Sequence, residues 1–206
     1  MVEPMWDGIL QGGPFLEIAF LLDTGAESRV RSLERVLGTL KSLSFPITFI
    51  HAGQNPNIMQ QFQEGHPYDP EDPGSLIGHE ARFPLIMGFP EERKATLFVA
   101  EVASRTIQYD FWFYGSEFDA PEWDQRGISP GEKPKFLTLL EELFRVYKFP
   151  LGVIGIEADC LSLFPDEQMW PSEAFQIAQF DPNKMPDTTE VWVVLWQGKY
   201  LKNSIF

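Results

Sequence analysis

The alternation of hydrophobic and polar positions is most regular between Ala95 and Ser116, and this stretch predicts the element at the centre of the fold. Its second arm places aromatic and β-branched residues on one face, namely Ile107, Tyr109, Phe111 and Phe113. Side chains of this kind at every second position are typical of β-strands. We therefore expect a hairpin of two strands joined by a tight turn at residues 103–105.

A strand, a helix and a second strand are predicted before this hairpin. Residues 15–22 form a nearly continuous apolar run, which favours a strand buried on both faces. Apolar residues then recur at helical spacing over 26–43, and Thr24 with Glu27 forms a capping-box pattern that predicts the start of the helix. A Phe-Pro pair ends this helix, and residues 47–51 predict a short strand.

A second helix and two more strands are predicted after the hairpin. The helix covers 134–148 and is again ended by Phe-Pro, with an apolar strand at 151–158. A strand at 191–197 follows, and the last residues suggest a final hairpin arm. Three proline-rich or acidic stretches between these elements predict long irregular loops, at 52–94, 117–131 and 159–190.

These elements together predict an α+β protein. We expect a mostly antiparallel sheet of six to seven strands, with the two main helices packed on one face. At 206 residues the chain is consistent with a single domain over 1–206, within which 15–51 and 95–158 are two strand–helix–strand halves.

The net charge restricts the classes of partner. The chain carries 30 acidic and 16 basic residues, a formal charge of −14. This charge repels nucleic-acid phosphates and attracts basic proteins or cations, although acidity also serves solubility alone. The single cysteine excludes an intrachain disulfide, and neither a signal peptide nor a membrane-spanning run is evident. We therefore expect a cytoplasmic protein that binds neither membranes nor nucleic acid directly.

Motifs for catalysis or metal binding are absent from the sequence. The three histidines lack metal-ligand spacing, and neither a nucleophile elbow nor a glycine-rich phosphate loop occurs, so no catalytic residue, metal site or cofactor is predicted. Cys160 follows Glu157 and Asp159, whose charges disfavour a thiolate, so we interpret it as a small buried residue. The best enzymatic alternative uses strand-end carboxylates, Asp23 and Asp159, alone or with a divalent cation.

The loops hold most of the negative charge, together with large aromatic residues. Residues 151–190 contain eight acids and one base, and residues 110–126 contain five acids and one base. Aromatic side chains within a charged rim are typical of protein-binding hot spots. This pattern predicts a partner-binding surface made of Asp119, Glu122, Trp123, Asp124, Asp166, Glu167 and Trp170.

Three functional hypotheses follow. The first is a non-catalytic acidic protein that binds and neutralises a basic protein such as a toxin or nuclease, by analogy with immunity proteins. The second is the small hydrolase or transferase that uses Asp23 and Asp159. The third is a self-associating protein whose dimer surface includes Trp112 and Tyr114 of the hairpin. The sequence leaves the oligomeric state open.

Overall fold

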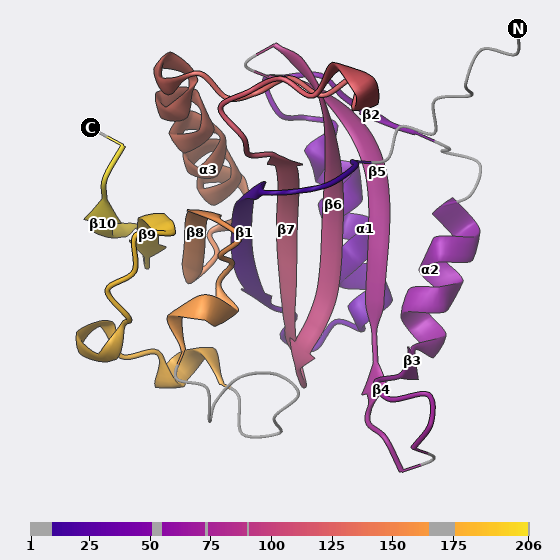
Figure 1. The fold of residues 1–206 in the computed structure, drawn as a ribbon. Coiled ribbons are helices and arrows are strands. Elements are labelled where there is room, and N and C mark those ends of the chain that lie inside the picture. The colour runs from indigo at the N-terminus through magenta and orange to yellow at the C-terminus, as the bar shows by residue number, and fades with distance from the viewer. Residues whose placement is uncertain (1–9, 51–54, 73, 90, 165–175, 206) are drawn as a thin grey trace, which may run out of the picture.

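An eight-stranded antiparallel sheet forms the centre of the computed structural model, which describes residues 10–50, 55–72, 74–89, 91–164 and 176–205 (Figure 1). From one edge to the other the strands are β10 (Lys199–Asn203), β9 (Val191–Trp196), β8 (Leu151–Ile156), β1 (Phe15–Asp23), β7 (Thr106–Tyr114), β6 (Glu92–Ala103), β5 (Glu80–Gly88) and β2 (Ile47–Phe49). A small antiparallel ribbon pairs β3 (His66–Pro67) with β4 (Ile77–Gly78). The predicted α+β class and antiparallel sheet are confirmed, whereas six to seven strands was too few.

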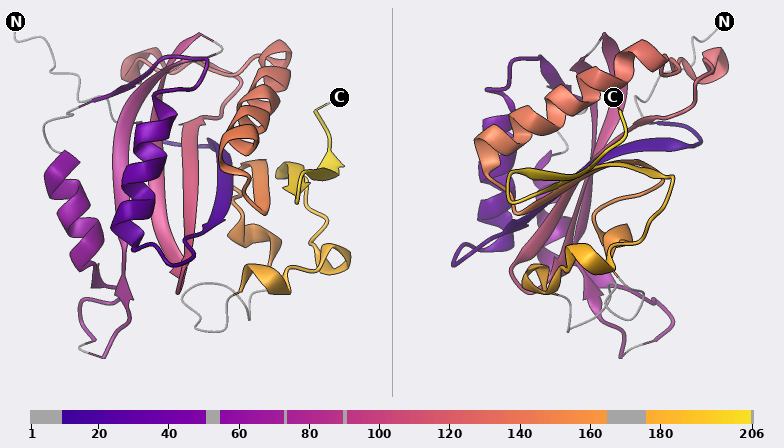
Figure 2. Two further views of the ribbon diagram at one scale, coloured as in Figure 1. Left: turned by 180° about the vertical axis from the view of Figure 1, so that it is seen from behind. Right: turned by 90° about the vertical axis from the view of Figure 1, so that its left-hand side faces the viewer.

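The two longest helices, α1 (Arg29–Leu40) and α3 (Lys133–Tyr147), lie on the same face of the sheet, which we call the helix face (Figure 2). A third helix, α2 (Asn55–Glu64), packs beside β5. Short 3₁₀ turns occupy the connections, at Pro121–Trp123, Pro130–Glu132, Leu161–Leu163, Ile177–Gln179 and Pro182–Lys184. Within the described ranges, every helix is too short or too polar to cross a membrane.

The helix face holds the larger hydrophobic core. Alternate residues of β1 and β7 point toward α1 and α3, and the apolar stripes of both helices are buried against them. Phe20 lies at the centre, where its ring stacks on Tyr109, Tyr147 and Phe149 at centroid distances of 5.3, 5.5 and 4.9 Å. Burial of large aromatic area at this point stabilises the packing of the helices on the sheet.

The other face of the sheet, which we call the opposite face, is covered only in part. The chain that follows β8 folds back across it, and Cys160, Leu163 and Phe164 pack on Leu21 and Val153 there. Phe180 closes this second core and stacks edge-on against Phe164. The remainder of the opposite face, over β5, β6 and β7, carries buried polar residues such as Gln108 and Asp110, together with half-buried aromatic residues.

The two predicted strand–helix–strand halves share one sheet. Strand β1 lies between β7 and β8, so a strand of the first half separates two strands of the second (Figure 1). Helix α3 therefore connects β7 to β8 across β1, and α1 connects β1 to the distant edge strand β2. Every strand nonetheless pairs antiparallel with its neighbours.

The predicted start of the first helix is wrong. Helix α1 begins after Ser28, whose hydroxyl accepts a hydrogen bond from Arg31 N at 3.4 Å. Thr24 is instead buried in the turn after β1, where its amide donates to Arg105 O at 2.8 Å. A complete capping box does occur at Ser129 and Glu132, before α3.

The region 52–94 is more regular than predicted, because it contains α2 and the nine-residue strand β5. Pro84 lies within β5, and its carbonyl accepts from Ile50 N at 2.9 Å on the side toward β2. Strand β2 pairs with β5 only through residues 47–49. The position that lacks an N–H therefore lies where the neighbouring strand has ended, so the sheet tolerates this proline.

Candidate functional site

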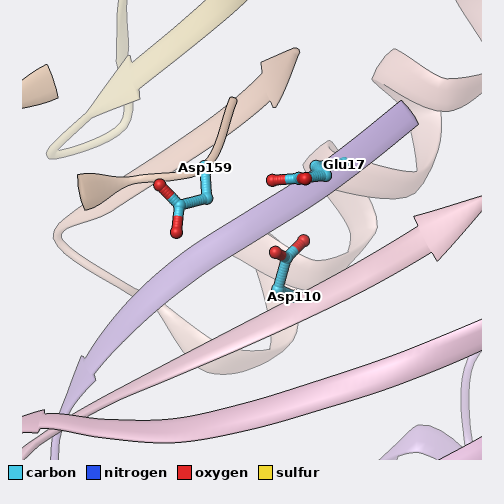
Figure 3. A group of neighbouring side chains, drawn as sticks. All are labelled: Glu17, Asp110 and Asp159. Atoms are coloured by element: carbon cyan, nitrogen blue, oxygen red, sulfur yellow. The ribbon is translucent and has the colours of Figure 1, made fainter. Parts of the chain in front are cut away.

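Three carboxylates meet on the opposite face of the sheet. Glu17 comes from β1, Asp110 from β7, and Asp159 from the chain just after β8. Their side chains point toward one another (Figure 3), and one oxygen of each lies within 4.8 Å of the others. We call this group the carboxylate cluster. Asp110 is buried, while Glu17 and Asp159 are half-buried, so solvent reaches the cluster from the side of Glu17 and Asp159 and not from Asp110.

Strand alternation and one sharp turn bring the cluster together. Glu17 and Asp110 project from the opposite face because their sequence neighbours in β1 and β7 face the helices. After β8 the backbone turns at Glu157, which adopts a left-handed φ of 49°. Glu157 Oε1 accepts a hydrogen bond from Phe15 N at 2.6 Å, and this contact fixes the turn that places Asp159 over β1.

Burial and like charge act together on the cluster. Burial, followed by the charges of Asp159 and Glu157, raises the pKa of Glu17 to about 8. Burial and the charges of Glu17 and Asp159 also raise the pKa of Asp110 well above its ordinary value. All of the charges that act on these two groups are negative. The isolated cluster therefore favours holding a proton between Glu17 and Asp110.

Three neighbouring side chains orient the carboxylates. Trp112 Nε1 donates to Asp110 Oδ2 at 2.6 Å. Gln108 Nε2 donates to Asp159 Oδ2 at 2.7 Å, and Ser162 donates to the other oxygen of Asp159 through both its amide and its hydroxyl at 3.1 Å. Gln108, Asp110 and Trp112 are alternate residues of β7, so a single strand supplies one member of the cluster and two of its supports.

An aromatic surface adjoins the cluster. The half-buried ring of Trp112 stacks between Phe15 and Phe98, at centroid distances of 5.7 and 5.0 Å. The guanidinium of Arg82 lies 5.5 Å from the ring centroids of Phe98 and Trp112. These contacts hold Trp112 in place beside Asp110.

A second candidate site contains four of the seven predicted partner-binding residues. Asp119, Glu122, Trp123 and Asp124 lie together in residues 116–127, which we call the acidic loop. Asp166, Glu167 and Trp170, the other three, lie outside the described residues. The loop borders a hollow of about 420 Å³ on the opposite face, lined in part by Lys94, Asp119 and Asp124.

Hydrogen bonds within the acidic loop, to Gln11 and to Lys94 of β6 hold it in place. Ala120 and Gln125 pair through two backbone hydrogen bonds, and the Gln125 side chain bonds both backbone groups of Gln11. Lys94 Nζ donates to Trp123 O at 2.6 Å, and Asp119 Oδ1 accepts from Gly127 N at 2.9 Å. These contacts connect the acidic loop to itself, to the N-terminal segment and to the sheet.

Part of the negative charge of the loop is balanced within the molecule. Asp124 lies 3.7 Å from Lys94, and Glu117 lies 3.8 Å from Lys133. Arg126, the single base of the loop, pairs with Glu91 outside the loop. The aromatic residues are stronger evidence for a binding surface, because Phe118 is 80% exposed and Trp123 is 41% exposed. Phe118 is not among the predicted partner-binding residues, although it lies between two acids in the predicted loop.

The carboxylate pair of the enzymatic alternative is separated in the structure. Asp23 is the exposed last residue of β1, where it accepts from Gly25 N at 2.7 Å and lies 3.7 Å from Arg105. Asp159 belongs to the carboxylate cluster instead. Cys160 is buried as predicted, and burial followed by the charge of Asp159 raises its pKa.

The sequence did not indicate that Glu17 and Asp110 lie together with Asp159. Their sequence signal was present, since Glu17 is the one charge in its apolar run and Asp110 interrupts an aromatic strand.

Comparison with known proteins identifies no relative of this chain. No family model matches the chain, and neither a curated protein nor a solved structure gives a significant match.

Proposed function

We propose that this chain is a non-catalytic binding protein whose acidic loop docks on a basic protein and neutralises it, in the manner of immunity proteins. The observation that carries the proposal is Phe118, which is 80% exposed on a loop held by hydrogen bonds. An exposed phenyl ring forgoes hydrophobic stabilisation that a partner surface would supply by covering it.

The acidic loop has the composition of a binding hot spot. Trp123 adds a second exposed ring, and four acids surround the two aromatics: Glu117, Asp119, Glu122 and Asp124. Buried aromatic anchors within a polar rim supply most of the affinity in protein complexes. Because the loop is already ordered, little conformational entropy is lost when it binds.

The charge of the chain favours a basic partner. A net charge of −14 creates a negative field that steers positive surfaces toward the molecule and repels nucleic acids. Such steering raises association rates at low salt by about 10- to 1000-fold and weakens as ions screen the field. We therefore expect a basic protein whose association with this chain slows steeply as salt is added.

The experiment compares the partners retained by immobilised wild-type protein with those retained by a Phe118→Ser/Trp123→Ser double variant. The expected result is that a basic protein is retained by the wild type and lost by the variant, because each anchor contributes about 2 kcal/mol or more. Tyr68→Ser is the matched control, since Tyr68 is 57% exposed in a different loop. Mass spectrometry identifies the retained proteins.

Kinetics with the identified partner complete the test. The association rate should fall with salt, while the double variant should mainly increase the dissociation rate. Retention of the same partner by the double variant, or partners that are all neutral or acidic, would contradict the proposal.

A second candidate function is the hydrolase or transferase, and the carboxylate cluster is the observation that favours it. In this version Asp159 acts with Glu17 and Asp110, and Asp23 has no role. Two carboxyl groups of unequal basicity are suited to general acid–base work. The test is an activity screen against ester, phosphoester and glycoside substrates. An activity abolished by Asp159→Asn but unaffected by Asp23→Asn would support it.

A further inference from the structure

We propose that the carboxylate cluster is a binding site for a hard divalent cation, with Glu17, Asp110 and Asp159 as ligands and Gln108 Oε1 as a fourth. This inference goes beyond the proposed docking function and does not depend on it. The cluster and the acidic loop use different residues, so the two proposals fail or succeed separately.

The geometry places three acidic oxygens around one point. One oxygen from each of Glu17, Asp110 and Asp159 lies within 4.8 Å of the other two, which is a spacing that a single ion can bridge. The side chains converge from three separate segments of the chain (Figure 3). Within the described ranges, no lysine or arginine forms an ion pair with any of them.

Gln108 gives a second and independent indication of a ligand. This side chain is only 1% exposed, and its Oε1 accepts no hydrogen bond from the described residues. Its amide lies against the cluster, because Nε2 donates to Asp159 Oδ2. A buried carbonyl oxygen without a donor is destabilising. Coordination of a cation would satisfy that oxygen.

The buried oxygen Asp110 Oδ1 leads to the same conclusion. Trp112 satisfies Oδ2, but Oδ1 is buried and receives no hydrogen bond from the described residues when both Asp110 and Glu17 are ionised. Either a proton held between the two carboxylates or a metal ion would relieve this arrangement.

The donor set selects the chemical class of the ion. Carboxylate and amide oxygens are hard ligands, which suit Mg²⁺, Ca²⁺ and Mn²⁺ and not metals that prefer sulfur or imidazole. Half-buried Glu17 and Asp159 leave one side of the site open to water. The remaining coordination positions would therefore be filled by water or by an oxygen of a bound molecule.

Terbium luminescence tests the proposal directly. Tb³⁺ occupies oxygen-ligand sites, and its emission is sensitised by a nearby indole. Trp112 is hydrogen-bonded to Asp110, so a bound Tb³⁺ lies beside an efficient donor. We expect sensitised emission that saturates at one ion per chain and falls when Ca²⁺ or Mn²⁺ is added in competition. Trp112→Phe should remove most of the emission while calorimetry still detects Ca²⁺.

Variants separate a real site from general attraction to an acidic protein. Asp110→Asn and Glu17→Gln should abolish the saturable emission. Gln108→Leu should weaken the affinity about 10- to 100-fold, the range found when groups around a metal are lost. Asp23→Asn is the matched control, because Asp23 is an exposed carboxylate that lies outside the cluster. This control should bind Tb³⁺ like the wild type.

Thermal unfolding shows whether each variant is folded, so that a loss of binding is not mistaken for misfolding. Asp110→Asn removes repulsion among the carboxylates, so without added metal its melting temperature should equal or exceed that of the wild type. Ca²⁺ or Mn²⁺ should raise the melting temperature of the wild type and leave that of Asp110→Asn unchanged. The proposal is wrong if the wild type shows no saturable binding, or if the folded Asp110→Asn protein binds with unchanged affinity.

Discussion

Gly155 of β8 lies opposite Glu17 of β1, and a Cβ atom at Gly155 would lie 2.7 Å from the carbonyl oxygen of Ala158. The chain that carries Asp159 therefore passes directly over this glycine. We expect Gly155→Ala to push that segment away from the sheet and to lower the free energy of unfolding by about 1–3 kcal/mol. Urea denaturation measures the loss, and Tb³⁺ titration should show a weaker site.

Gly38 provides the control for this substitution. It lies within α1, and a Cβ atom there would meet no other atom within 4 Å. Gly38→Ala should raise the free energy of unfolding by about 0.5–1 kcal/mol, because alanine loses less backbone entropy in a helix. Equal effects of the two substitutions would show that the close approach at Gly155 has no energetic importance.

The buried ion pair before α3 predicts a loss of stability in acid. Arg93 Nη2 lies 2.7 Å from Glu132 Oε1, with both side chains buried. Burial alone would raise the pKa of Glu132, but hydrogen bonds from Ser129 and Arg93 outweigh it and lower the pKa below 4.5. The stabilisation is therefore present above pH 4.5 and is lost as the pH falls through the folded-state value.

Glu132→Gln tests that assignment. We expect it to lower the free energy of unfolding by about 3–5 kcal/mol at neutral pH, because Arg93 stays buried without its counter-ion. The variant should also lose less stability than the wild type as the pH falls. Glu122→Gln, at an exposed position of the acidic loop, should change neither quantity. Parallel acid-branch curves for wild type and Glu132→Gln would contradict the assignment.

The two faces of β1 should differ in their tolerance of truncation. Phe20 is fully buried on the helix face among three aromatic rings, so Phe20→Ala should cost about 3–5 kcal/mol. Phe15, on the same strand but on the opposite face, is half-buried and stacks on Trp112, so Phe15→Ala should cost less. Thermal or urea unfolding of the pair provides the comparison, and a larger cost at Phe15 would mean that the faces are misassigned.

Cys160 should be unreactive in the native protein. The thiol is buried, and burial together with the charge of Asp159 raises its pKa, so little thiolate is present at neutral pH. Labelling by a disulfide reagent should be slow in buffer and rapid in denaturant. Because the chain has a single cysteine, the absorbance change reports this site alone. Rapid labelling of the folded protein would show that the segment after β8 opens readily.

Local patterns predicted the elements that rest on local physics. The hairpin at 95–116 was predictable because period-2 alternation and a short turn suffice to define it, and the structure has β6 and β7 there. Strand β5 alternates just as clearly, with Ala81, Phe83 and Leu85 buried, but the proline at position 84 argued against a strand there. That proline is acceptable only because β2 is short, which is a long-range fact that local sequence does not contain.

The sequence shows the members of the carboxylate cluster as isolated acidic residues, but it does not show that they meet. Glu17, Asp110 and Asp159 are far apart in the sequence, and their meeting depends on β1 lying between β7 and β8. Strand order of this kind is set by packing of the whole sheet and not by spacing along the chain. In the acidic loop, by contrast, four of the predicted residues were neighbours in sequence, so their proximity required no knowledge of the fold.

The position of β1 has a consequence for how the protein is made. Among the strands of the described sheet, β1 is synthesised first, and both of its partners, β7 and β8, are synthesised much later. Its run of apolar residues is thus without a partner for most of translation, which is the condition under which nascent chains aggregate. We expect the yield of native protein to depend on chaperones that shield residues 15–23 until β8 has emerged.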